Sequence, residues 1–123
     1  MCEAVRIHVR YELPDENGQT RRERNADFGV GDRSPPLIVP PAGRHLWEWY
    51  FELSESVMRV IDGVTYKIPP TEVYAEASLA GRIVYPDEYA ILRAMDRAFC
   101  SEMAKEVEAF QAREQERRAR KRD

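Results

Sequence analysis

A long stripe of apolar residues near the carboxyl end of the chain constrains its fold most strongly. Proline in a first turn and two carboxylates at the positive end of the helix dipole favour a helix start at Pro86-Asp87-Glu88. The apolar positions that follow recur at spacings of three and four, and they are Ile91 or Leu92, Met95, Phe99, Met103 or Cys100, Val107 and Phe110. The pattern predicts an amphipathic helix from about Pro86 to at least Phe110, with Met95 buried.

The last thirteen residues differ in character from this helix. Residues 111–123 contain no large apolar side chain and end in the basic run 117–122. We expect a solvated extension of the helix that frays into a charged tail.

A second periodic segment begins after Gly43. Its apolar positions are Leu46, Tyr50, Leu53, Val57 and Val60 or Ile61, with Trp47, Phe51 and Met58 widening the same face. This spacing favours a helix of about four turns that stops at Asp62-Gly63. A competing interpretation pairs residues 59–61 with residues 64–66 as a hairpin turned by Asp62-Gly63.

A third, shorter helix is predicted between these two. The residues Ile68-Pro69-Pro70-Thr71-Glu72 open it, because the first amides of a helix have no partner within the helix and tolerate proline. Gly81 is expected to end it.

The first 43 residues have a different pattern. Residues 4–13 alternate apolar and polar side chains, which predicts a half-buried strand that stops at the turn signal of residues 14–18. Residues 19–34 are polar and predict a loop, and four prolines within residues 35–41 indicate an extended connector. The predicted fold class is therefore mainly α: a strand-like segment and connector in 1–43, a domain of three helices in 44–110, and a charged tail in 111–123.

Composition limits the possible functions. The 123 residues are 43% hydrophobic and 33% charged, with a net charge of −3 that does not favour phosphate binding by the protein as a whole. No apolar run approaches the roughly 18 to 20 residues that span a bilayer, and Met1-Cys2-Glu3-Ala4 is unlike a signal peptide. Cys2 and Cys100 have no metal-binding spacing, so we expect a protein of the reducing cytoplasm.

The residues that could carry chemistry do not form a catalytic pattern. His8 and His45 have no nucleophile or carboxylate at a suggestive spacing, and we expect surface or packing roles for both. Gly29-Val30-Gly31 lacks the context of a phosphate loop. Asp87, Glu88 and Asp96 are interpreted as solvated or dipole-complementing helix residues. We therefore predict no enzyme activity, no cofactor and no metal.

The helix predicted after Ile68 and the helix that begins at Pro86 also permit a helix-turn-helix interpretation. The recognition helix would then meet DNA with the end that carries Asp87 and Glu88, and both carboxylates would be repelled by phosphates. Nucleic-acid binding is therefore not expected.

Four aromatic residues lie within five positions of the helix predicted after Gly43. Because neighbouring helix positions diverge by about 100°, Trp47, Tyr50 and Phe51 are expected to face inward and Trp49 outward. Aromatic side chains are favoured anchors in protein interfaces. The candidate partner-binding residues are therefore Trp47, Trp49, Tyr50, Phe51 and Tyr74.

The order of these motifs resembles small tail assembly chaperones of long-tailed bacteriophages and prophages. The resemblance covers about residues 44–103 and is carried by Leu46–Ser54, Ile68–Val73, Leu79-Ala80-Gly81, Pro86-x-Glu88 and Ile91–Phe99. It implies a non-enzymatic protein of the bacterial cytoplasm that binds the tape-measure protein, recruits tail-tube subunits and is absent from the finished virion. A homo-oligomer is possible on this interpretation, and a membrane role is not expected.

Two alternatives belong to other functional classes. The first is a minor structural tail or head–tail connector protein that stays in the particle. The second is a small nucleic-acid-binding regulator that uses the helix predicted after Ile68 and the helix that begins at Pro86, together with the basic tail.

Overall fold

The computed structural model describes residues 1–15, 17–28 and 34–122. Within these residues the protein is mainly helical, with five α-helices and a single two-stranded sheet. The predicted mainly α fold class is therefore confirmed, although the helices are more numerous than the three predicted. The candidate turn Gly29-Val30-Gly31 lies outside the described residues.

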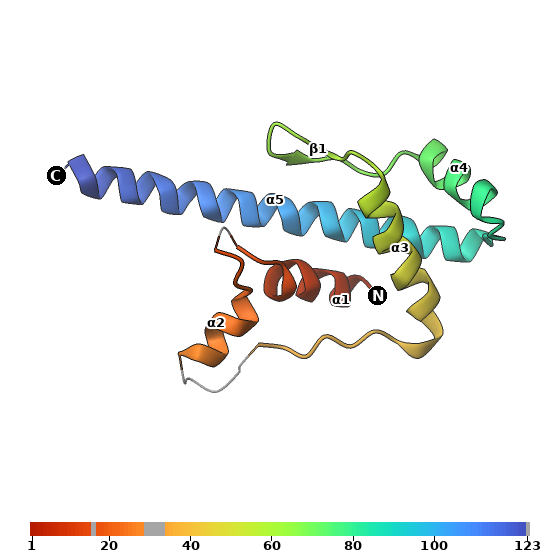
Figure 1. Ribbon diagram of the computed structural model, residues 1–123, viewed down its shortest axis with the longest axis horizontal. Helices are drawn as coiled ribbons and strands as arrows, with labels where there is room; N and C mark the ends of the chain where they lie inside the picture. Colours follow the sequence, from red (N-terminus) through yellow and green to blue (C-terminus); the bar gives the residue numbers. More distant parts are fainter. Residues whose placement is uncertain (16, 29–33, 123) are drawn as a thin grey trace.

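Helix α5 is the longest element, and α1, α3 and strand β2 contact it. It runs over Pro86–Arg122, and its 37 residues make a rod of about 55 Å (Figure 1). Leu92, Met95 and Ala98 are buried on one face, as the apolar stripe predicts for Met95. The helix also continues through the charged tail, so the predicted helical extension is confirmed as far as Arg122.

Helix α3 covers part of this face. It runs over Arg44–Ser56, after a short 3₁₀ turn at Pro41–Gly43. Its buried residues recur at spacings of three and four, and they are Leu46, Trp49, Tyr50 and Leu53. This stripe packs against the α5 stripe and forms one core with it.

The segment after α3 corrects the predicted helix end. Strands β1 (Val60–Ile61) and β2 (Val64–Thr65) pair in antiparallel register, with Ile61 opposite Val64. Asp62 and Gly63 have φ of 52° and 79°, the positive values that a tight two-residue hairpin turn needs at both central positions. The helix predicted to reach Ile61 therefore ends at Ser56, and the competing hairpin interpretation is correct.

Helix α4 matches its prediction closely. It runs over Pro70–Ala80 and ends at Gly81, whose φ of 69° is left-handed. Val73 and Ala77 face the core, together with Ile68 just before the helix.

The amino-terminal segment is helical, so the strand predicted at residues 4–13 is wrong. Helix α1 (Cys2–Ile7) continues into a π-helical turn, η1 (His8–Glu12), and both pack along α5. Val5 and Val9 are buried by this packing. The only strands among the described residues are β1 and β2, so a strand here would have no ladder partner, whereas a helix pairs its own amides and carbonyls.

The predicted loop at 19–34 also contains a helix. Helix α2 covers Arg21–Asp27 and begins with a capping box, in which Thr20 and Glu23 each bond the backbone of the other. The prolines that follow keep residues 35–40 free of regular secondary structure, as predicted.

Candidate functional site

The structure contradicts the predicted placement of Trp49 on α3, whereas Tyr50 is buried as predicted. Trp49, expected outside, is only 3% exposed, whereas Trp47 and Phe51 are half-buried. Helix α4 is the reason: Glu76 accepts a hydrogen bond from the indole N–H of Trp49, and the Arg82 guanidinium lies 5.5 Å from the centre of that ring system. Trp49 is therefore a core residue between α3 and α4.

Trp47 and Phe51 pack against the edge of the core and form an aromatic cluster with His8. The His8 ring lies 4.6 Å from the Phe51 ring and 5.8 Å from the Trp47 ring, measured between centroids. Burial lowers the pKa of His8 below its usual value, and the nearby Glu12 carboxylate opposes this effect. His8 therefore has a packing role on a helix rather than on the strand predicted.

A buried polar cluster joins α3, the hairpin and α5. One oxygen of Asp96 accepts hydrogen bonds from the Tyr50 hydroxyl at 2.9 Å and from the Arg59 guanidinium at 2.6 Å. The other oxygen accepts the backbone N–H of Ile68 at 2.8 Å. Burial raises the pKa of the Tyr50 hydroxyl and of the nearby Cys100 thiol.

This cluster corrects the interpretation of Asp96 as a solvated residue, because Asp96 is only 7% exposed. Three donors already fill its oxygens, so its arrangement suits a structural anchor rather than a base or a metal ligand. In the described ranges no group of His, Cys, Asp and Glu is placed to hold a metal ion. The two other acidic candidates lie in the first turn of α5, where Glu88 contacts His45 at 2.7 Å and this hydrogen bond lowers the pKa of Glu88.

Most of the exposed large apolar side chains lie in two places. The first, which we call the hairpin set, lies on β1, β2 and the residue after them, and consists of Val60, Ile61, Val64 and Tyr66, each 52–55% exposed. The second, the α4 set, lies on α4 and the connection to α5, and consists of Tyr74, Leu79, Ile83 and Tyr85, exposed by 60–90%. Figure 1 shows the hairpin and α4 on the same side of α5.

Of the five predicted partner-binding residues, Tyr74 is the most accessible, at 76% exposure. Tyr50 is fully buried and cannot meet a partner without unfolding. The sequence does not predict the other members of the two sets as binding residues, because an apolar residue in a short helix or hairpin normally indicates the core. The available signal is the position of Leu79 and Ile83 on either side of the helix stop at Gly81, since residues at a helix end are often exposed.

Comparison with protein-family models, with curated proteins and with solved structures finds no match for this chain. None of the described helices combines the length and the apolar character needed to cross a bilayer.

Proposed function

We propose that the protein is a non-enzymatic tail assembly chaperone that binds an apolar helical segment of a phage tape-measure protein. The resemblance of residues 44–103 supports the class, and the exposed α4 set carries the proposal. Leu79 and Ile83 are 90% and 80% exposed. Neighbouring apolar side chains left exposed on a folded domain are typical of a protein-binding site.

The chemistry of the proposed client follows from this surface. An amphipathic helix would cover Leu79, Ile83 and Tyr85 with its apolar face, the mode in which amphipathic helices bind apolar surfaces. Tyr74 adds an aromatic side chain with a hydroxyl that can remain in water at the edge of the contact. Binding in the bacterial cytoplasm, before tail-tube subunits join, would keep the apolar client from aggregating.

Co-expression of the protein with segments of a tape-measure protein tests this proposal. Leu79→Ser with Ile83→Ser should weaken capture of the client by at least ten-fold, because two exposed apolar contacts are lost and no core residue is removed. Ile38→Ser is the matched control, since Ile38 is 69% exposed on the distant connector and should bind as the parent does. Equal capture by all three proteins would contradict the proposal.

A second measurement separates the chaperone from a structural virion component. A chaperone that leaves before completion should be missing from purified particles when they are analysed by mass spectrometry. Stoichiometric amounts in the particle would instead support a minor tail or head–tail connector protein.

A further inference from the structure

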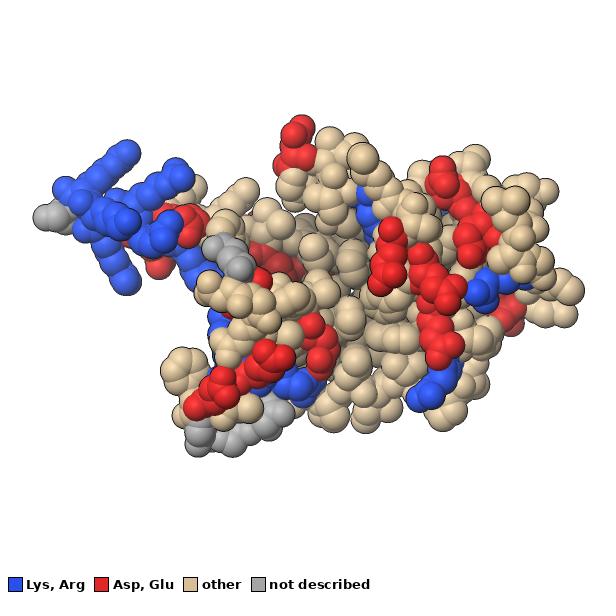
Figure 2. Space-filling model, in the orientation of Figure 1, with Lys and Arg blue, Asp and Glu red and all other residues tan. Residues whose placement is uncertain are grey.

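The carboxyl-terminal part of α5 projects from the body formed by the other described residues (Figure 1). Twelve of its residues follow Phe110, and Arg113 among them lines a groove with Val9, Leu13 and Asp15. Residues 111–123 contain six basic and three acidic side chains, so this segment carries +3 while the preceding 110 residues carry −6. Figure 2 shows the basic side chains gathered at this end.

Three arginines form a stripe along the projecting helix. Arg113, Arg117 and Arg120 are exposed and are spaced by four and three residues, which places them on one helix face. Arg117 pairs with Glu114 at 2.7 Å. Arg113 and Arg120 form no ion pair with any residue that the structure describes.

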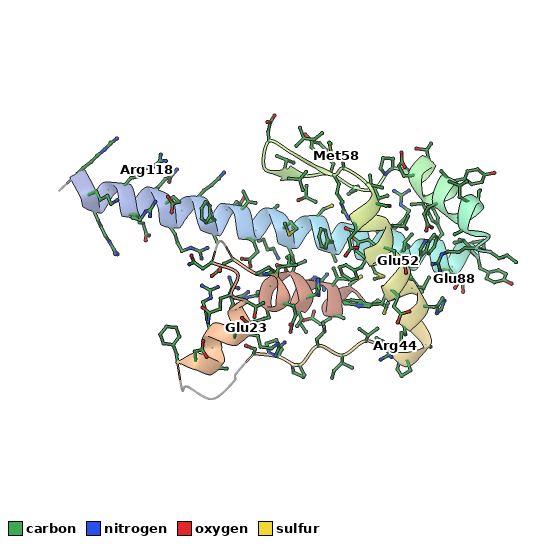
Figure 3. All side chains as sticks on the ribbon, viewed as in Figure 1. Glu23, Arg44, Glu52, Met58, Glu88 and Arg118 are labelled. Atoms are coloured by element: carbon green, nitrogen blue, oxygen red, sulfur yellow. The ribbon has the colours of Figure 1, made fainter. Side chains whose placement is uncertain are left out.

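Helix α3 carries an acidic stripe with the same spacing. Glu48, Glu52 and Glu55 are exposed on the side of α3 away from its buried stripe. Figure 2 shows acidic side chains over α3, and Figure 3 labels Glu52 among them. Glu52 contacts Arg82 at 3.0 Å with 60% of its side chain still exposed, and Glu48 and Glu55 have no ion pair within the described ranges.

The two stripes cannot meet within one chain. Tyr50 of α3 bonds Asp96 of α5 at 2.9 Å, which fixes where α3 crosses the long helix. Arg117 lies 21 residues further along, or roughly 30 Å at the rise of an α-helix. The arginine stripe and the glutamate stripe of α3 can therefore meet only between two molecules.

We propose that residues 111–122 of α5 bind α3 of a second copy of this chain, with the arginine stripe on the glutamate stripe. In an antiparallel alignment, Arg113 faces Glu55 and Arg120 faces Glu48, with Arg117 and Glu52 between them. The contact joins two different surfaces, so it is a head-to-tail association. It does not depend on the proposed client.

An apolar contact extends the same alignment. Met58 is 87% exposed two residues after α3, beyond the Glu55 end of the glutamate stripe, and Phe110 is 43% exposed just before the Arg113 end of the arginine stripe. Phe110 also lines a groove of about 400 Å³ whose lining combines Val9, Leu13 and Met103 with charged side chains, among them Arg10, Asp15 and Arg113. The Met58 side chain can enter this groove, and its burial adds to ion pairs that contribute little by themselves at a surface.

A second copy is favoured over nucleic acid as the partner of the basic end. The exposed glutamates of α3 repeat at the same spacing of four and three residues as the arginines, a match that the evenly charged phosphate backbone of a nucleic acid does not offer.

The molar mass in solution, measured by light scattering or sedimentation, tests this contact. The parent should exceed 14.3 kDa at about 10 mM salt and return to that mass at about 1 M, where screening is nearly complete. Glu48→Arg with Glu55→Arg, and separately Arg113→Glu with Arg120→Glu, should each give monomers. A mixture of these two variants should associate again, because each reversed stripe then finds a complementary one.

The control is Glu72→Arg with Glu108→Arg, which makes the same charge change at exposed residues outside both stripes and should associate as the parent does. A parent that remains at 14.3 kDa at low salt overturns the proposal, as does a mixture of variants that stays monomeric. So does a parent that binds a labelled oligonucleotide through Arg113 and Arg120 and does not self-associate. Circular dichroism of each variant verifies that it is folded.

Discussion

Asp96 is the residue on which the most segments converge. It accepts bonds from Tyr50 in α3, Arg59 at the hairpin and Ile68 before α4, while its own backbone lies in α5. Arg59 and Asp96 are 6% and 7% exposed, so each charge depends on the other for its compensation. A buried ion pair adds little net stability compared with apolar residues, but losing one partner leaves an uncompensated charge.

We therefore expect Arg59→Met to lower the free energy of unfolding by about 3–5 kcal/mol, since Asp96 would be left buried without its cation. Urea unfolding measures the loss. Adding Asp96→Asn to Arg59→Met should recover part of it, because the charge disappears while an oxygen remains for the Ile68 N–H. A double variant less stable than the single one would show that Asp96 is not destabilised by the loss of Arg59.

Trp49 and Trp47 differ in environment although they are two positions apart. Trp49→Ala should lower the free energy of unfolding by about 3–5 kcal/mol, because it leaves a cavity between α3 and α4 and removes the donor to Glu76. Trp47→Ala is the matched control and should cost less, since Trp47 is half-buried. Thermal melts of both variants measure the difference, and the reverse order would contradict the assigned faces.

His8 should make stability depend on pH. Because burial lowers its pKa in the folded state, the unfolded chain binds more protons between that lowered value and the ordinary pKa of about 6.5. The contribution of His8 to stability is therefore complete above pH 6.5 and is lost as the pH falls below it. Urea unfolding between about pH 8 and 5.5 should show a smaller decline for His8→Gln than for the parent. Identical profiles would mean that His8 is already accessible in the folded state.

At the scale of elements, local backbone conformation rather than packing determines where α4 ends and where the hairpin turns. Helix α4 begins and ends at residues whose conformations suit those positions, Pro70 at the start and Gly81 at the stop. The hairpin depends on positive φ at Asp62 and Gly63 rather than on burial, because its strands are largely exposed.

Gly63→Ala should therefore weaken the hairpin by about 1 kcal/mol, since a Cβ is strained at φ 79° although nothing lies within 4 Å of it. The global free energy of unfolding, measured in urea, should fall by no more than this amount. The Arg59–Asp96 pair should persist, because Arg59 precedes the turn. A loss several times larger would mean that the turn conformation also holds the Arg59 cluster in place.

At the scale of the whole molecule, the two ends of the chain make unequal contributions. The first thirteen residues bury Ala4, Val5, Ile7 and Val9, and Val5 lies in the same core as Leu53 and Met95. The last thirteen residues contain no large apolar side chain.

Two truncations of equal length test this asymmetry. Removing residues 111–123 should leave the melting temperature within a few degrees of the parent, because little apolar area is lost. Removing residues 1–13 should unfold the domain, since several buried side chains contribute about 1.5–3 kcal/mol each, against a total stability of about 5–15 kcal/mol. Circular dichroism melts compare them, and a stable amino-terminal truncation would show that α1 is not part of the core.

The sequence by itself determined the elements whose signals are local. Backbone restrictions and a 3.6-residue period account for them in any surroundings: the start at Pro86, the apolar stripe with Met95, the stop at Gly81 and the proline connector.

Only the tertiary structure decided the rest. Residues 4–13 alternate like a strand but are helical against α5, because a strand depends on a neighbouring strand and the described residues place none beside this segment. Trp49 is buried because α4 covers its side of α3, and Asp96 is buried because Arg59 and Ile68 meet it there. Each of these outcomes depends on which face a distant element covers, and the period of a helix does not contain that information.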